Sequence, residues 1–308
     1  EKITIMQNTI LEERIIWFEE RAEKSLKKIK PEYWDFSDSL LLYSPGAADI
    51  YKDIQCNAVY GDTLTNPEID FLEINARPIM SLIKKDFNFI DLGPGTEYQK
   101  QSILLSSAQS LGKHVENYIP VDVNYQILDE SSSFIGKKFN VDTVICQSSF
   151  EKLHQHGFMS IGDVPNFIYL GPTFMNFGFE RITEMIDSWL KPGDIFFGSV
   201  QHREGFIQNP SLQYAGINMK MLLEKKLSLL GLTPDEYQLE INDKVTCLAH
   251  IRTEPKSQRA SMLKKGDTVL TMMSIKYEKK EIIRKLKERY DCRFYDDDKF
   301  LGFSLYKK

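Results

Sequence analysis

Short apolar runs alternate with amphipathic stretches through the middle of the chain. The apolar runs have the length of buried strands and occupy residues 88–92, 118–123, 141–146, 166–170 and 194–200. Between them lie stretches with apolar residues at helical spacing, among them 99–111 and 179–190. Alternation of this kind predicts an α/β fold, a doubly wound parallel sheet with helices on both faces.

The pattern is different on either side of this region. Residues 10–26 have the spacing of an amphipathic helix, and residues 31–66 form a long segment rich in aromatic residues, of the kind that covers a pocket. Beyond residue 200 the pattern predicts a helix, two antiparallel strands, a charged helix and a closing hairpin, at 218–230, 239–253, 266–277, 279–289 and 292–305. We therefore predict a core domain of residues 67–200 plus 276–308, and an inserted α+β domain, a substrate-binding domain or lid, of residues 1–66 plus 201–275.

Composition and charge disfavour several classes of protein. The 308 residues carry 39 Lys and Arg against 44 Asp and Glu, a net charge of −5, which disfavours nucleic acid as a partner. The 4 cysteines form no paired motif, and the His154–His156 pair has no third ligand near it in the sequence, so we expect neither a disulfide framework nor a metal site. No apolar run approaches the roughly 18–20 residues that span a bilayer. These features predict a cytoplasmic protein with no membrane partner, and they leave the oligomeric state open.

The strongest chemical signal is Asp91-Leu-Gly-Pro-Gly95, which follows a predicted strand and precedes a predicted helix. In doubly wound sheets, ligands bind beyond the carboxyl ends of the strands, where glycines let the backbone approach them. A dinucleotide turn needs a small residue where this chain has Tyr98. A carboxylate before the glycines instead suits a cofactor with sulfonium and ammonium groups, and S-adenosylmethionine has both. Asp122, at the end of the next predicted strand, is suited to accepting hydrogen bonds from ribose hydroxyl groups.

Several stretches of the chain resemble the histidine N-α-methyltransferases of ergothioneine biosynthesis and occur in the same order as in that family. These enzymes use S-adenosylmethionine to methylate the α-amine of an amino acid. The resemblance covers about residues 10–308. The matching stretches are Tyr43-Ser-Pro-Gly-Ala-Ala-Asp-Ile-Tyr-Lys-Asp-Ile, Tyr60-Gly-Asp-Thr-Leu-Thr-Asn-Pro-Glu, Asp91-Leu-Gly-Pro-Gly-Thr, Tyr118-Ile-Pro-Val-Asp-Val, Leu170-Gly-Pro-Thr-Phe-Met-Asn-Phe, Leu190-Lys-Pro-Gly-Asp and Ser274-Ile-Lys-Tyr. The stretch around Asn176 is the most specific, because generic Rossmann-like methyltransferases lack it.

The resemblance implies a Rossmann-like class I methyltransferase fold and S-adenosylmethionine as the cofactor. It implies that Gly93, Gly95 and Asp122 hold the cofactor. The whole predicted cofactor site comprises Asp91, Gly93, Gly95, Thr96, Asp122, Val123, Ser149 and Phe150.

The resemblance also implies an acceptor site. Tyr60 is similar to a tyrosine that meets both cofactor and substrate, and Asn176 to an asparagine that orients the amino and carboxylate groups, so these two are the predicted catalytic residues. Ser274 matches a serine near the substrate side chain. Tyr43 and Phe206 are predicted to contact the substrate as well.

Several positions depart from the family pattern. Met272 stands where the family usually has a glutamate that contacts the imidazole, and a pocket tyrosine is replaced near Phe206 or Ile207. Ser149 and Gln201 stand where acids are expected. Loss of the imidazole-facing carboxylate argues against histidine as the substrate, and a methionine suits an apolar or aromatic side chain better.

These observations predict an S-adenosylmethionine-dependent N-methyltransferase whose partner is a small-molecule amine, an amino acid or a related compound other than histidine. A peptide α-amine has a reference pKa of about 7.7–8.0, so it loses its proton readily near neutral pH and needs no strong base. Asn176 and Tyr60 can accept its N–H hydrogen bonds and aim the lone pair. The replaced acids leave one alternative open: a protein of the same fold that binds the cofactor without methylating, or uses it for another reaction.

Overall fold

The computed structural model describes residues 16–55, 58–84, 86–155, 164–205, 216–242 and 246–307. Its contacts divide the chain into two compact units, which are described separately. Unit 1 comprises Glu1–Asn57 and Asn209–Ser274, and unit 2 comprises Ala58–Gln208 and Ile275–Lys308.

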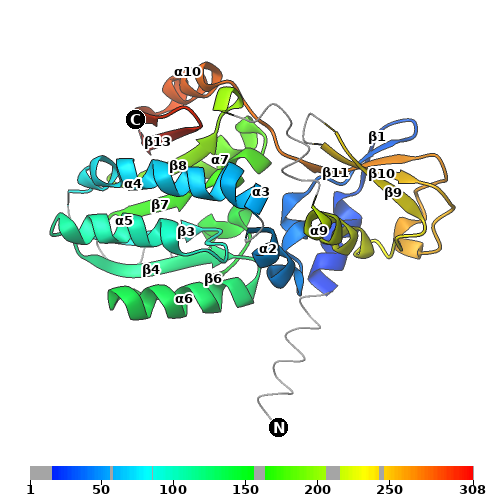
Figure 1. Ribbon diagram of the computed structural model, residues 1–308, viewed down its shortest axis with the longest axis horizontal. Helices are drawn as coiled ribbons and strands as arrows, with labels where there is room; N and C mark the ends of the chain where they lie inside the picture. Colours follow the sequence, from blue (N-terminus) through cyan, green and yellow to red (C-terminus); the bar gives the residue numbers. More distant parts are fainter. Residues whose placement is uncertain are drawn as a thin grey trace, which may run out of the picture. The chain divides into compact units, whose positions relative to one another are not determined.

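The centre of unit 2 is a sheet of eight strands (Figure 1). In spatial order the path is β12 (Asp291–Asp296), β13 (Phe300–Tyr306), β8 (Ile195–Gln201), β7 (Asn166–Leu170), β3 (Phe87–Leu92), β4 (Val115–Asp122) and β5 (Asp142–Thr143), and β6 (Cys146–Gln147) also pairs with β4. All pairs are parallel except those of β13, which runs antiparallel to both of its neighbours. The predicted doubly wound parallel sheet is therefore confirmed.

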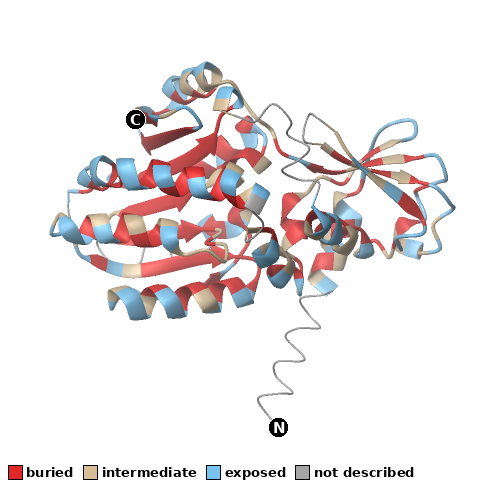
Figure 2. Cartoon of the chain, in the orientation of Figure 1, coloured by how far each residue is buried: buried red, intermediate tan, exposed pale blue. Residues whose placement is uncertain are grey.

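Alternate residues of these strands face opposite layers of helices. Phe87 and Phe89 of β3 pack with α4 (Asn66–Ser81), α5 (Gln99–Ser110) and α6 (Tyr125–Phe139). Ile90 and Leu92 pack in a second core with α7 (Phe179–Trp189) and α10 (Lys279–Arg289). In Figure 2 the central strands β3, β4, β7 and β8 are largely buried, while α4, α5 and α6 expose their outer faces. Because these strands are buried on both faces, their sequences are continuous apolar runs.

Unit 2 also contains shorter helical segments. A helical turn α3 (Ala58–Tyr60) and a π-helical turn η2 (Gly61–Thr65) lead directly into α4. The 3₁₀ segments η3 (Phe150–Gln155), η5 (Pro172–Asn176) and η6 (Arg203–Gly205) follow β6, β7 and β8. Each continues the chain from the carboxyl end of a parallel strand, the edge at which α/β sheets bind ligands.

Unit 1 is an α+β structure with its own sheet of five strands. The order is β1 (Lys27–Lys30), β2 (Tyr33–Asp35), β11 (Thr268–Met273), β10 (Thr246–Ile251) and β9 (Tyr237–Ile241), and only the β2–β11 pair is parallel. Residues 16–25 are helical, and η1 (Ser39–Tyr43), α2 (Ala47–Gln55), α9 (Ile217–Ser228) and η7 (Gln258–Ala260) complete the unit.

Three local predictions differ from the structure. The aromatic-rich segment 31–66 contains the strand β2, because Tyr33–Asp35 pairs with a strand more than two hundred residues later, which local pattern cannot show. The predicted strand 141–146 is replaced by two strands of two residues each, β5 and β6. Residues 58–66 and 201–205 group with the parallel sheet in unit 2, whereas the prediction assigned them to the inserted domain.

The predicted helix 10–26 is described only from residue 16, so its first residues lie outside the described chain. Among the described residues, no helix combines the length and apolar character needed to cross a membrane.

Candidate functional site

The glycine turn lies where β3 ends, at the carboxyl edge of the sheet in unit 2. Gly93 has φ +69° and Gly95 has φ +68°, a conformation that glycine adopts without steric cost. The Gly93 N–H donates to the Val121 carbonyl of β4 at 2.8 Å, which ties the turn to the neighbouring strand. A Cβ at Gly93 would lie 3.4 Å from the Phe150 ring, so the turn and η3 approach each other closely.

Asp91 lies at the base of this turn and is almost completely buried. The Tyr118 hydroxyl donates to its Oδ2 at 2.6 Å, whereas Oδ1 has no hydrogen-bond partner among the described residues. Burial raises the pKa of Asp91 to about 6, against the opposing effects of the Tyr118 hydrogen bond, the Gln101 side chain and the Lys100 charge. A buried acceptor without a donor is costly, and a ligand N–H would remove that cost.

Gln101, in the first turn of α5, is a candidate residue that sequence reasoning missed. Its Nε2 donates to the Pro94 carbonyl inside the glycine turn at 2.9 Å, and its Oε1 is a second buried acceptor without a partner among the described residues. A polar side chain on the inward face of a helix directly after a glycine turn is the signal that could have revealed it.

Asp122 ends β4, the strand next to the glycine turn. Its Oδ1 accepts the Asn124 N–H at 2.8 Å, and burial raises its pKa to about 7 against this hydrogen bond. The Ser148 N–H donates to the Asp122 carbonyl at 3.0 Å, which brings the following segment alongside. That segment carries Ser149, whose buried Oγ has no partner among the described residues.

The structure brings the eight predicted cofactor residues to one edge of the sheet. Asp91 is the penultimate residue of β3, and Asp122 is the last residue of the adjacent parallel strand β4. Phe150, at the start of η3, approaches Gly93 and packs against Phe177 with ring centroids 6.1 Å apart. Val123 is buried directly after Asp122, and Thr96 is half-buried in the turn.

Two predicted acceptor residues belong to the same unit. Asn176 is the last residue of η5 and half-buried, and Tyr60, also half-buried, is the last residue of α3. The Ile275 N–H donates to the Met175 carbonyl at 3.3 Å, so the segment entering α10 is tied to the residue before Asn176.

The other predicted acceptor residues belong to unit 1 or are not described. Tyr43 ends η1 and packs edge-on against Tyr51 at 5.5 Å between ring centroids. Met272 is buried on β11, opposite Cys247 of β10, and Ser274 is buried directly after that strand. Phe206 lies outside the described residues.

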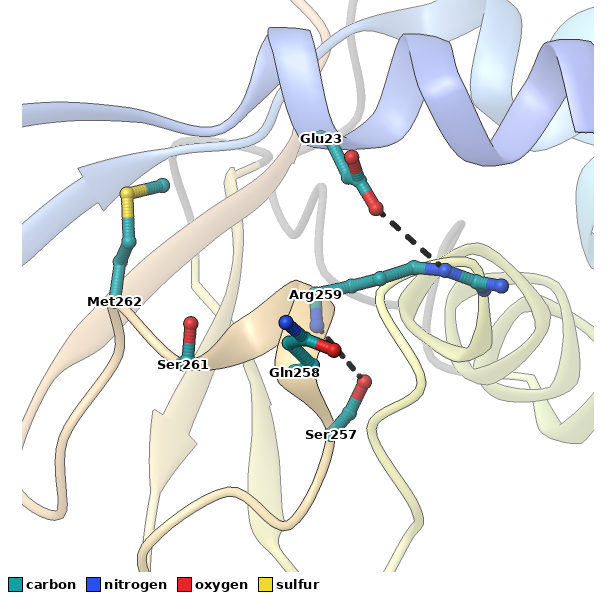
Figure 3. Close-up of a pocket in the computed structure, with 6 residues that line it drawn as sticks. All are labelled: Glu23, Ser257, Gln258, Arg259, Ser261 and Met262. Atoms are coloured by element: carbon teal, nitrogen blue, oxygen red, sulfur yellow. Dashed lines mark hydrogen bonds and ion pairs between the residues drawn. The ribbon is translucent and has the colours of Figure 1, made fainter.

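A cavity of about 760 Å³ lies in unit 1, and its lining includes none of the predicted site residues. Figure 3 shows its lining: Glu23, Ser257, Gln258, Arg259, Ser261 and Met262. The Arg259 guanidinium pairs with Glu23 at 3.6 Å and with Glu19 at 2.7 Å, so its charge is compensated inside the unit. In the described part of the chain, no group of three or more His, Cys, Asp or Glu side chains is arranged to hold a metal ion.

The family model for SAM-dependent, histidine-specific methyltransferases matches residues 19–203. The chain belongs to this family. It is an S-adenosylmethionine-dependent methyltransferase with a Rossmann-like class I sheet, whose antiparallel strand β13 lies between β12 and β8.

Three solved structures illustrate what the methyltransferase is similar to. A SAM-dependent methyltransferase from Aquifex aeolicus is 12% identical over 75% of this chain and 88% of its own, with a TM-score of 0.40. An O-methyltransferase family protein from Burkholderia thailandensis is 9% identical over 89% of this chain and 63% of its own, with a TM-score of 0.48. The plantazolicin methyltransferase BpumL, solved with a desmethyl substrate analogue and SAH, is 10% identical over 97% of this chain and 100% of its own, with a TM-score of 0.42. A comparison with curated proteins gave no match.

Proposed function

We propose that this methyltransferase transfers a methyl group to the amine of an amino acid or a related small molecule whose side chain is apolar or aromatic, rather than to histidine. The observation that carries the proposal is the position of Asn176. It follows β7, the strand next to the one that bears the glycine turn, and it is tied in place through Met175. A neutral amide oxygen there can accept an N–H from an uncharged amine, which keeps the nitrogen lone pair available.

The cofactor residues of unit 2 fit S-adenosylmethionine, on the evidence of their buried acceptors. The Oδ1 of Asp91 is suited to the ammonium group of the cofactor, and the Asp122 carboxylate to the ribose hydroxyls. Gly93 and Gly95 leave the backbone open to close approach, with Thr96 and Val123 beside it, and Ser149 and Phe150 are assigned to the adenine. When bound, the cofactor supplies an activated methyl group on a sulfonium centre.

The residues of the chain then have to orient the acceptor. The acceptor amine has to be neutral when it attacks, so the site has to bind the deprotonated amine and aim its lone pair at the methyl group. Tyr60 is assigned a second hydrogen bond to the acceptor. The resemblance assigns Met272 to the substrate side chain, for which a methionine is an apolar and adaptable contact.

The test is methyl transfer from radiolabelled S-adenosylmethionine to a panel of amino acids and small amines that includes histidine. We expect label on the amine of an apolar or aromatic amino acid, and little on histidine. Asn176→Ala is expected to lower kcat by about 100-fold while calorimetry shows unchanged binding of S-adenosylhomocysteine. Label on histidine alone, or on a carbon or oxygen atom, would contradict the proposal. Tight cofactor binding with no amine labelled would support the alternative of a different reaction.

A further inference from the structure

Glu68, near the start of α4, is a fully buried carboxylate with three donors. Its Oε2 accepts the Lys100 ammonium at 2.9 Å. Its Oε1 accepts the Tyr169 hydroxyl at 3.1 Å and also the Ser199 hydroxyl. The four residues come from α4, α5, β7 and β8, so one carboxylate joins four elements of unit 2.

On one side, this carboxylate touches the end of the strand that leads to Asn176. Tyr169 lies at the carboxyl end of β7, and a Cβ at Gly171 would lie 3.1 Å from the Glu68 Oε1. Burial and the Glu68 charge both raise the pKa of Tyr169 well above its usual value, so its phenol stays protonated and remains a donor. The segment that carries Asn176 therefore begins against Glu68.

On the other side, the carboxylate holds a cation beside the glycine turn. Lys100 is in the first turn of α5, directly after the turn, and its charge lowers the pKa of Asp91 against the effect of burial. The other ionisable groups that interact with Asp91 are Tyr118 and Asp122 on β4 and Tyr169 on β7.

A buried ion pair is by itself no gain in stability over well-packed apolar residues, because both charges lose their hydration. The Glu68–Lys100 pair lies between the glycine turn and the segment that carries Asn176, so a role in positioning these two parts explains why the pair is there. We propose that Glu68 is a positioning residue for methyl transfer, which holds Lys100 within electrostatic reach of Asp91 on the cofactor side and the start of the Asn176 segment on the acceptor side. The inference rests on the proposed roles of Asp91 and Asn176.

The first test measures the pH dependence of S-adenosylhomocysteine binding by calorimetry. In Glu68→Gln the amide still accepts from the hydroxyls, but Lys100 loses the negative charge of Glu68, so the binding midpoint is expected to fall by about 0.5–1 pH unit. In Lys100→Met the cation is lost, so the midpoint is expected to rise. Opposite shifts from two partners of one ion pair are not expected from loosened packing, which would shift affinity in the same direction in both variants.

The second test measures the effect of Glu68 on the acceptor side separately from its effect on cofactor binding. Tyr169→Phe keeps both charges and removes one hydroxyl, so we expect kcat to fall about tenfold while the midpoint and affinity of cofactor binding stay at the wild-type values. If Glu68→Gln does not fold, the double variant Glu68→Gln/Lys100→Met is compared with Lys100→Met: its midpoint is expected to be lower, because the Glu68 charge that disfavours ionisation of Asp91 is gone.

Midpoints that shift in the same direction in both single variants, or in neither, would overturn the inference, as would a wild-type protein without pH-dependent binding. The binding measurements need no acceptor. Failure to methylate any amine would therefore count against the proposed function, and the role of Glu68 would still be decided by the midpoints.

Discussion

The Tyr118 hydroxyl donates a 2.6 Å hydrogen bond to Oδ2 of Asp91, and so leaves only Oδ1 of that carboxylate for a further donor. Both residues are buried on adjacent parallel strands at the edge where the glycine turn begins. The phenol orients the carboxylate and opposes the effect of burial on its pKa. A carboxylate held in this way can recognise one cationic N–H group with a fixed geometry.

Asp91→Asn tests this recognition through pH. The pKa of Asp91 is raised to about 6, so in the free protein the carboxylate becomes charged as the pH rises through that value. Affinity for S-adenosylhomocysteine is therefore expected to rise between about pH 5 and 7 in the wild type. The variant should bind 10- to 100-fold more weakly at pH 7.5, by the usual contribution of about 1.5–3 kcal/mol for a hydrogen bond to a charged group. Its affinity should also vary less with pH. Calorimetry at several pH values measures both effects, and an unchanged pH profile in Asp91→Asn would remove Asp91 from the cofactor site.

Tyr118→Phe tests the same contact from the other partner. The variant removes the hydrogen bond to Oδ2 of this buried carboxylate, which costs about 1–3 kcal/mol of unfolding free energy. Loss of the hydrogen bond is also expected to raise the pKa of Asp91 further, so the binding midpoint should move to higher pH. Urea unfolding gives the first quantity and calorimetry the second. Equal stability of variant and wild type would show that the contact is not made in solution.

Two glycines with the same backbone conformation allow a matched comparison. Gly93 has φ +69° and Gly112 has φ +70°, but a Cβ at Gly112 would meet nothing within 4 Å. Gly93→Ala and Gly112→Ala should each lose about 1–2 kcal/mol of unfolding free energy, because an L residue is strained at positive φ. Only Gly93→Ala should weaken cofactor binding. Comparable loss of binding in both variants would mean that global stability, and not the turn, determines affinity.

Lys226 of unit 1 gives a prediction for stability against pH. Its ammonium is completely buried, donates to the carbonyls of Asp38 and Thr271 at 2.8 and 2.7 Å, and lies 5.0 Å from the centroid of the Phe36 ring. Burial lowers its pKa to about 7, while the unfolded chain holds the proton up to about pH 10. Between these values the unfolded state binds more protons, so this lysine makes the unfolding free energy rise with pH.

Comparison with Lys226→Met isolates that contribution. The wild type should gain about 1 kcal/mol or more relative to the variant between pH 7 and 9.5, measured by urea unfolding at a series of pH values. Lys220→Met, an exposed position on the same helix α9, should leave the pH dependence unchanged. A constant difference between wild type and Lys226→Met over this range would show that Lys226 is not held uncharged at the upper end.

Much of the cofactor edge was predictable, because its features are local. The apolar runs for β3, β4, β7 and β8 are buried on both faces, so they are visible in the sequence without knowledge of their partners. The glycine turn and Asp122 follow such runs directly, and parallel strands bring their carboxyl ends to one edge. The order of short strands and helices was enough to place these residues together.

The sequence by itself therefore determined the sheet of unit 2, the turn at its edge and the acids that end β3 and β4, since each depends on neighbouring residues and on a simple alternation. Only the tertiary structure decided that Glu68 meets Tyr169 and Ser199, which are 101 and 131 residues away, and that β2 pairs in parallel with β11. The physical reason is that tertiary packing determines which residues lie next to a buried carboxylate or an edge strand. The local sequence around either partner does not indicate which distant residue it will contact.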